Sequence, residues 1–216
     1  MTTMMMKFFV TVCAILGVAE AFAPSRTPTS SSTSTSLKAY SDPKSLPGAI
    51  LPLGFFDPLG FSDCDIDTLK RYREAEIVHG RAGMLAVVGI LVGEQVTGWN
   101  TLFNKEISGP AITHLKQLPV EVLALMVIII GTIEIDRANV GFVEPDRAPF
   151  PGVLRKTYEP GNVGFDPLGL KPRRGSELYM MQTKEIQNGR LAMLAAAGMM
   201  AQETVDGQGI LEHLQL

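Results

Sequence analysis

The chain has 216 residues, a length that suits one domain. Its mean hydropathy is positive and its formal net charge is −3, and it has no basic patch suited to nucleic acid. Its two cysteines are too few for a disulfide framework, so we expect neither a nucleic-acid partner nor a disulfide-stapled fold.

The first 38 residues have the composition of a two-part leader. Residues 1–23 are typical of a signal peptide, because Lys7 precedes an apolar run and small residues follow around Ala21. Residues 23–36 are rich in Ser, Thr and Pro and contain no acid, which is typical of a transit peptide. Together the two parts resemble the two-part leader of plastid proteins in algae with secondary plastids, so we expect 1–38 to be a signal plus plastid transit peptide and 39–216 to be the mature domain. Plain secretion is the alternative.

Residues 40–68 are punctuated by Pro and Gly, and we expect them to be extended. We expect helices over 69–97, 119–138 and 176–204, with Pro119 in a first turn and Ser176 as an N-cap. We expect loops over 98–118 and 139–174, a turn over 206–209, and a short amphipathic C-terminal helix on the membrane surface over 210–216.

An internal repeat relates the first and third of these helices at an offset of 109 residues. Between 56–94 and 165–203, 15 of 39 positions are identical without a gap. FDPLG at 56–60 returns at 165–169, and the motif E-I-x-x-G-R-x-x-M-L begins at Glu76 and again at Glu185. We therefore treat 54–97 and 163–206 as two copies of one unit.

Each copy is long enough to cross a membrane only if its charged residues lie in the bilayer or at its edge. From 76 to 96 there are about 21 residues, or roughly 31 Å of helix. Ionisable groups at that depth are costly and need partners. Glu76 and Arg81 lie about 140° apart around their own helix and pair poorly with each other.

The repeat offers a better pairing. One apolar span lies between the copies, so the copies run parallel and can be related by a pseudo-twofold axis along the membrane normal. That symmetry predicts the ion pairs Glu76–Arg190 and Glu185–Arg81, with Gly80 and Gly189 letting the two backbones approach. The sequence thus predicts an all-α membrane protein with three transmembrane helices, the first and third crossed.

Cations gather at the N-terminal ends of the first and third helices and after the second. By the positive-inside rule this side is equivalent to cytoplasm, which in a thylakoid is the stroma, and it includes the N-terminus of the domain. Only Lys105 and Lys116 lie on the other side.

The polar residues of these helices suit axial coordination of Mg²⁺ in a porphyrin-like ring. A neutral imidazole, an amide oxygen, or a carboxylate whose charge an Arg offsets can each serve. Glu76 with His79, and Glu185 with Asn188, lie on adjacent helix surface. Gln202 faces the same way as Asn188, and on the second helix Glu134 has Arg137 at i+3.

Alternative interpretations remain at several of these positions. The Glu and Arg residues could lock a helix bundle without a cofactor, and Gln202 could form an interhelical hydrogen bond. His114 reads as a loop histidine, and His213 as either a surface residue or a terminal ligand. The Met residues of the helices read as packing.

The paired motifs E-x-x-H-G-R-x-x-M-L and E-x-x-N-G-R-x-x-M-L resemble those of the light-harvesting chlorophyll a/b- or a/c-binding proteins. The resemblance covers about 54–216. It implies three transmembrane helices cross-linked by Glu–Arg pairs, in agreement with the symmetry argument. With the two-part leader and the short loop after the second helix, the chain is most similar to the fucoxanthin chlorophyll a/c branch of algae with red-derived secondary plastids.

The resemblance also implies roles for individual residues. It makes chlorophyll-site residues of Glu76, His79, Arg81, Glu134, Arg137, Glu185, Asn188, Arg190, Gln202 and His213. Among these, the chlorophyll magnesium would bind through Glu76, His79, Glu134, Glu185, Asn188 and Gln202. The two FDPLG segments look like carotenoid sites, with Phe56, Asp57, Pro58, Phe165, Asp166 and Pro167.

The expected function is a light-harvesting antenna in the plastid thylakoid membrane that passes excitation energy to a photosystem and makes or breaks no bond, so it is not an enzyme. The branch implies chlorophyll a, chlorophyll c and fucoxanthin or a related xanthophyll. It also implies as partners a photosystem I or II core, other antenna subunits and thylakoid lipid. One rival is a photoprotective, energy-dissipating member of the same family, and the other is a small transporter with a parallel repeat.

Overall fold

The computed structural model describes residues 42–50, 54–95, 107–148, 152–172 and 174–214. The expected leader, 1–38, lies outside the described residues. The described part is helical, with two isolated β-bridges, Ile50 to Gly54 and Phe142 to Leu154, and no strand. Its elements are η1 (Pro43–Ser45), α3 (Ile66–Gln95), α4 (Ala111–Gln117), α5 (Val120–Gly141), α6 (Gly175–Asp206) and α7 (Ile210–His213).

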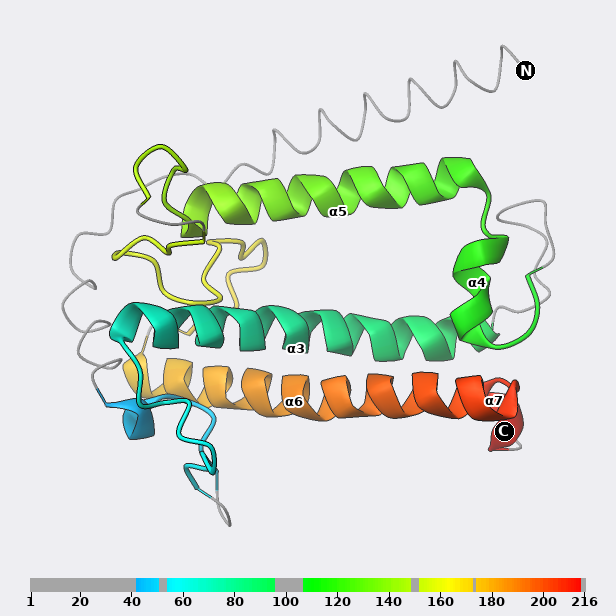
Figure 1. The fold of residues 1–216 in the computed structure, drawn as a ribbon, viewed down its shortest axis with the longest axis horizontal. Helices are drawn as coiled ribbons and strands as arrows, with labels where there is room; N and C mark the ends of the chain where they lie inside the picture. Colours follow the sequence, from blue (N-terminus) through cyan, green and yellow to red (C-terminus); the bar gives the residue numbers. More distant parts are fainter. Residues whose placement is uncertain (1–41, 51–53, 96–106, 149–151, 173, 215–216) are drawn as a thin grey trace.

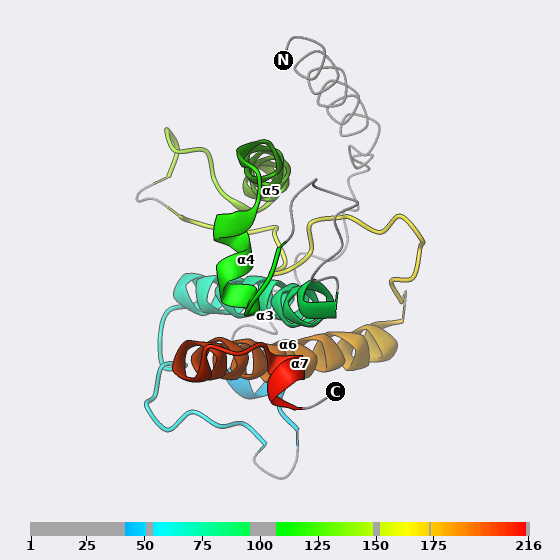
Figure 2. The ribbon, with the colours of Figure 1, turned by 90° about the vertical axis from the view of Figure 1, so that its right-hand side faces the viewer.

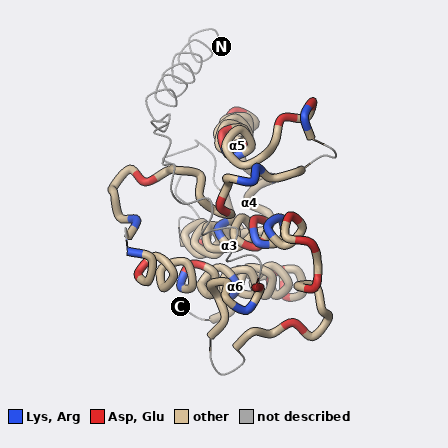
Figure 3. The backbone as a smooth tube through the Cα atoms, turned by 90° about the vertical axis from the view of Figure 1, so that its left-hand side faces the viewer, with Lys and Arg blue, Asp and Glu red and all other residues tan. Residues whose placement is uncertain are grey.

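Helices α3 and α6 form the centre of the fold. They lie side by side and run in the same direction, while α5 runs the opposite way (Figure 1). The parallel arrangement of the two repeat copies is therefore as expected. Figure 3 views the end of the molecule where α3 and α6 begin and α5 ends, and Lys, Arg, Asp and Glu lie along the segments nearest the viewer.

The crossing of α3 and α6 depends on small residues. A Cβ added to Gly80 would lie 3.0 Å from the Cα of Gly189, and one added to Gly189 would lie 2.9 Å from the Cα of Gly80. A Cβ on Gly83 would lie 3.0 Å from the backbone nitrogen of Met193. The two backbones thus approach closely at the paired glycines, as the sequence predicts.

Helix α5 stands apart from this pair, joined to it through α4 at one end and through the loop after α5 at the other (Figures 1 and 2). Its side chains are apolar almost all round, yet only Gly141 is buried. Val120 and Val127, for example, are 72% and 70% exposed. Such a helix is suited to an apolar surrounding such as lipid or bound pigment.

The structure corrects several expected boundaries. Helix α3 begins three residues before the expected start at Leu69, and α5 extends to Gly141 with Pro119 at its N-cap rather than in its first turn. The N-cap of α6 is Arg174, without a side-chain cap bond, so the prediction of Ser176 as the cap is wrong. Part of the expected loop 98–118 is helix α4.

The turn after α6 and the C-terminal helix are close to expectation. Gly207 ends α6 in the left-handed conformation, with φ of +67°, and α7 follows at Ile210.

By length and composition, α3 is long and apolar enough to cross a membrane. Helices α4 and α5 pass the same test only when they are taken together as one span, and a bend of 106° separates them. The third helix, α6, does not pass this test. The all-helical fold is established for the described residues, and the three-span arrangement is taken up below as a proposal.

Candidate functional site

Two ion pairs join α3 to α6 crosswise. Arg81 places Nε and Nη2 each 2.8 Å from Oε1 of Glu185. Arg190 places Nε and Nη2 at 2.8 and 2.7 Å from Oε1 of Glu76. These are the two pairs that the repeat symmetry predicts, so the pairing prediction is confirmed. All four side chains are half-buried, and each charge has its opposite within contact distance.

Each of these arginines also binds a backbone carbonyl of a Pro-Gly segment. Arg81 Nη2 donates to the Gly161 carbonyl at 2.9 Å, and Arg190 Nη1 donates to the Gly48 carbonyl at 2.9 Å. Both glycines have positive φ, +81° and +109°, and a Cβ there would press on Ile77 and Ile186, which are themselves repeat equivalents. The symmetry of the site therefore includes the loops.

Sequence reasoning missed these carbonyl acceptors. The signal was present, since Pro-Gly precedes each FDPLG segment. Its spacing differs between copies, because Gly48 stands eight residues before Phe56 and Gly161 four before Phe165, and a gapless comparison passes over it.

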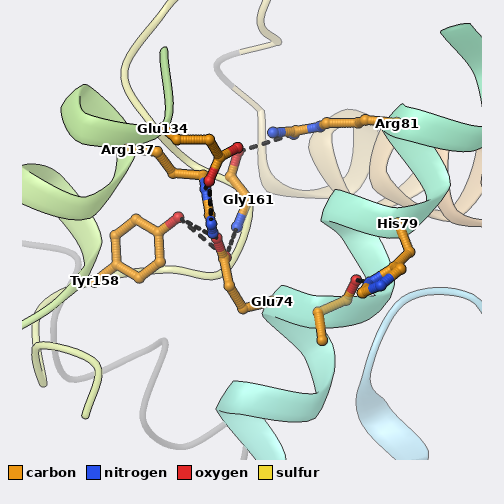
Figure 4. A network of polar contacts seen from close by, with 8 residues as sticks. Glu74, His79, Arg81, Glu134, Arg137, Tyr158 and Gly161 are labelled. Carbon is orange, nitrogen blue, oxygen red and sulfur yellow. Dashed lines mark hydrogen bonds and ion pairs between the residues drawn. The ribbon is translucent and has the colours of Figure 1, made fainter. Parts of the chain in front are cut away.

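A buried carboxylate on α3, Glu74, ties the second helix to the crossed pair (Figure 4). Glu74 is 4% exposed. It accepts hydrogen bonds from Arg137 Nη1 at 2.9 Å, from the Tyr158 hydroxyl at 3.1 and 3.0 Å, and from the Gly161 amide at 2.7 Å. A buried charge is tolerated only with such partners.

The same arginine completes the pair expected on α5. Arg137 contacts Oε2 of Glu134 through Nη2 at 2.6 Å and through Nε at 3.0 Å, which confirms the Glu134–Arg137 pair. Burial and the neighbouring Glu74 carboxylate raise the pKa of Tyr158, so its hydroxyl stays protonated and donates to Glu74. Sequence reasoning assigned no role to Glu74 or Tyr158.

Both oxygens of Glu76 contact arginines, whereas other candidate magnesium ligands present free donor atoms within the described residues. Nδ1 of His79 lies 2.7 Å from the Ala75 carbonyl, which places the proton on Nδ1 and leaves the Nε2 lone pair outward. Within the described residues, Oε2 of Glu185, Oε1 of Glu134 and the amide of Asn188 accept no hydrogen bond. Imidazole, amide and charge-compensated carboxylate are donors that fit the Mg²⁺ of a chlorophyll.

A cavity of about 470 Å³ opens beside His79, between the first part of α3 and the loop that follows α5. Its walls carry both apolar and charged side chains, and the charged ones are Arg71, Glu74 and Arg137. The lining is formed by Thr68, Arg71, Tyr72, Glu74, Ala75, Val78, His79, Arg137, Phe142, Gly152 and Leu154.

Gln202 and His213 meet on a common acid near the end of α6. Gln202 Nε2 donates to Oδ2 of Asp206, and His213 Nδ1 lies 3.2 Å from the same oxygen. Gln202 therefore bonds within its own helix, and the alternative of an interhelical hydrogen bond is not what the described residues show. The amide oxygen of Gln202 remains as a hard donor that suits magnesium. His114, read from sequence as a loop residue, lies in α4 and contacts the Gly109 carbonyl at 2.8 Å.

Two repeat-equivalent acids hold the short helices at this end. Glu94 accepts from the Ile210 and Leu211 amides at 2.7 and 2.8 Å, at the start of α7. Glu203 is 2% exposed and accepts from the Ile112 amide at 2.8 Å, at the start of α4. The sequence analysis did not predict these capping roles.

The FDPLG segments are closed by their aspartates. Asp57 accepts from the amides of Phe61 and Ser62 at 3.1 and 2.7 Å, and Asp166 from those of Leu170 and Lys171 at 2.9 and 3.0 Å. Hydrogen bonds to each aspartate hold its pKa below the ordinary value. The largest cause is the bond from the Ser62 hydroxyl for Asp57 and the bond from the Lys171 amide for Asp166. The neighbouring phenylalanines are exposed. The carotenoid role of these segments stays a prediction.

The geometry defines a class of protein. Two parallel helices cross at glycines and neutralise each other's charges, and carboxylate, imidazole and amide donors remain free among their described residues. Donors of this kind on a rigid helical frame suit the axial coordination of metal-centred rings.

Comparison with known proteins identifies the family within this class. The family model described as "Chlorophyll A-B binding protein" matches residues 42–204, and the chain belongs to this family.

Several relatives cover most of the chain. It is 48% identical to light-harvesting complex stress-related protein 3.2 of Chlamydomonas reinhardtii, over 80% of this chain and 68% of that protein. It is 46% identical to a fucoxanthin-chlorophyll a-c binding protein of Isochrysis galbana, over 75% of this chain and 77% of the relative. It is 38% identical to chlorophyll a-b binding protein 6 of Arabidopsis thaliana, over 74% of this chain and 64% of that protein. All three relatives are chloroplastic.

Proposed function

We propose that the chain is a pigment-binding antenna of the thylakoid membrane that passes excitation energy to a photosystem. The observation that carries the proposal is the crosswise pairing of Glu76 with Arg190 and Glu185 with Arg81. An acid neutralised in this way can coordinate magnesium in an apolar setting without leaving an uncompensated charge. No step of this function makes or breaks a covalent bond, so the protein acts by positioning and is not an enzyme.

The proposed magnesium ligands are Glu76, His79, Glu134, Glu185, Asn188 and Gln202, with His213 as a further chlorophyll-site residue. Bound chlorophyll would supply the absorption of light. The protein fixes ring separations through α3 and α6 and excludes water from the metal. Family membership and the relative from Isochrysis support chlorophyll a and c with fucoxanthin or a related xanthophyll, the latter along the FDPLG segments 56–60 and 165–169.

The proposed membrane arrangement has three spans, α3, α5 and α6, with the N-terminus of the domain on the stromal side. The direction of the helices supports it, as do the Lys and Arg residues at the start of α3 and α6 and in the loop after α5. Helix α6 is polar for a span, and the two charged residues nearest its middle, Glu185 and Arg190, are neutralised by pairing with α3.

The test is reconstitution of the purified chain with and without chlorophyll and xanthophyll. We expect a coloured complex with an ordered visible circular dichroism spectrum, and loss of part of its chlorophyll in Glu76→Ala and in Glu185→Ala. A colourless product, or two variants that keep the full chlorophyll content, would refute the proposal.

A second candidate function is photoprotective dissipation by the same fold. It is favoured by the 46–48% identity to three stress-related light-harvesting proteins of Chlamydomonas reinhardtii. The acids Glu94 and Glu203, which hold α7 and α4, lie on the side proposed to face the lumen.

Fluorescence lifetime against pH separates the two functions. A dissipating protein shortens the chlorophyll lifetime as pH falls from 7.5 to 5, whereas an antenna keeps it constant over this range. If the lifetime shortens in the wild type but stays constant in Glu94→Gln, the hydrogen bonds from α7 to Glu94 take part in the pH response.

A further inference from the structure

The two halves of the site differ in the residue three positions before each paired glutamate. On α3 this residue is Arg73, and at the equivalent position on α6 it is Gln182. Arg73 is 8% exposed, and its Nη1 lies 2.7 Å from Oε2 of Glu76. Its Nη2 donates to the Pro47 carbonyl, which fixes the guanidinium in place.

Glu76 is consequently held by two cations and Glu185 by one. Arg190 occupies Oε1 of Glu76 while Arg73 occupies Oε2. In the part of the chain that the structure describes, the only ion pair of Glu185 is with Arg81, on Oε1, and its Oε2 is open. The net charge of Glu76 with its two paired arginines is +1, and that of Glu185 with Arg81 is zero, although both glutamates belong to the same motif, E-I-x-x-G-R.

This difference acts directly on metal binding. A carboxylate has about four lone-pair sites on its two oxygens, and each guanidinium N–H that it accepts uses one. Charge-assisted donors on both oxygens also withdraw electron density, which lowers the basicity of the oxygen left for a metal. A fixed positive charge nearby further opposes the approach of Mg²⁺.

We propose that Arg73 makes the two symmetric glutamates unequal magnesium ligands, so that Glu185 binds its chlorophyll more tightly than Glu76. Arg73 is thus a specificity-determining residue that acts through Glu76 rather than by touching the ring. The proposal rests on the proposed function, since it takes both glutamates as chlorophyll ligands.

The reciprocal exchange Arg73→Gln and Gln182→Arg tests it. The refolded protein is titrated with chlorophyll a, and the absorption bands lost in Glu76→Ala and in Glu185→Ala report the two sites. In the wild type the Glu185 band fills first. Arg73→Gln lowers the chlorophyll concentration that half-fills the Glu76 band, on the order of tenfold, the size seen for outer-shell partners of metal ligands. Gln182→Arg raises that of the Glu185 band by a similar factor.

A third variant separates the charge from folding. Arg73→Lys keeps the cation beside Glu76, so the chlorophyll concentration that half-fills its Glu76 band should equal that of the wild type. If Arg73→Gln fails to refold because the Pro47 contact is lost, Gln182→Arg still decides, since it adds a cation and removes no contact to Glu76.

The outcomes distinguish the two proposals. If Glu76→Ala and Glu185→Ala each remove a band but neither exchange shifts the filling of its site, the role of Arg73 is refuted and the proposed function stands. If neither alanine variant removes a band, the proposed function itself fails.

Discussion

Glu74 and Glu76 show how two acids two positions apart take different roles. Glu76 faces α6 and stays half-buried with an oxygen near each of two arginines, whereas Glu74 faces the other way and is buried among Arg137, Tyr158 and Gly161. Glu76 belongs to the repeated motif, whereas the residue equivalent to Glu74 on α6 is Thr183. The contacts of Glu74 with Arg137, Tyr158 and Gly161, all distant along the chain, make it a structural acid.

Removal of the Glu74 carboxylate should therefore destabilise the domain. Glu74→Ala leaves Arg137 without its α3 partner and leaves the Tyr158 hydroxyl and the Gly161 amide unpaired. We expect a loss of about 3 kcal/mol in the free energy of unfolding, the usual size for breaking a buried ion pair. Equilibrium unfolding of the refolded complex in detergent measures it.

The matched control is Glu177→Ala, which removes the exposed i,i+3 pair with Arg174 and should cost less than about 1 kcal/mol. Tyr158→Phe, which removes a single donor, should lie between the two at about 1 kcal/mol. A Glu74→Ala variant as stable as the control would show that the cluster does not hold α5.

The aspartates of the FDPLG segments predict a pH dependence with a definite sign. Their pKa values are lowered from the ordinary 3.8, so the stability that their hydrogen bonds contribute is present above pH 3.8 and is lost as pH falls through the lower folded-state pKa. The two turns should thus stay closed at the mildly acidic pH that tests photoprotection.

The Ser62 hydroxyl is the first cause of the lowered pKa of Asp57. Ser62→Ala should therefore raise the pKa of Asp57 toward 3.8 and leave that of Asp166 where it is. Carboxyl-carbon NMR titration of both aspartates checks this. An unchanged Asp57 value in Ser62→Ala would contradict the contact.

At the scale of elements, the glycine crossing sets the geometry of α3 and α6. Gly80→Ala places a Cβ about as close to the Gly189 backbone as any real contact allows, so the helices must separate. Overpacking of this kind costs about 1–3 kcal/mol, and it should also lower the chlorophyll content, because both interhelix ion pairs span the same crossing.

Gly198→Ala is the control on α6, where an added Cβ meets nothing within 4 Å. It should stabilise the helix by about 1 kcal/mol through propensity alone. Thermal unfolding and chlorophyll content of the two variants give the comparison, and equal behaviour would mean that the backbones are not in contact.

The sequence predicted the long elements well and the short ones poorly. The repeat and the apolar periods placed three long helices within a few residues of their observed ends. Helix α4 was missed because seven residues carry little periodic signal, and what holds it in place is the Glu203 carboxylate on a different helix. The start of α6 was misplaced because the preference of Ser for N-cap positions pointed to Ser176. The observed N-cap is Arg174, and no side chain forms a capping hydrogen bond there.

At the scale of the whole molecule, symmetry explains which site residues could be predicted. The Glu–Arg pairs followed from two copies of one motif and a parallel arrangement, with no further information. The contacts that break the symmetry, those of Arg73 and Glu74, could not be predicted, because the equivalent residues on α6 are Gln182 and Thr183 and offer no pattern. The molecule is thus a symmetric frame with unequal local surroundings, which is suited to holding pigments of unequal energy.

The chlorophyll content of Arg190→Leu is the most direct test of this account. The substitution removes no ligand atom and leaves Glu76 in place, with only Arg73 beside it. The account predicts loss of chlorophyll after reconstitution similar to that in Glu76→Ala, because Arg190 is the partner that holds Glu76 against α6, whereas Arg73 lies on the same helix as Glu76 and cannot join the two helices. An Arg190→Leu variant that binds as much chlorophyll as the wild type would contradict the claim that the ion pair builds the site.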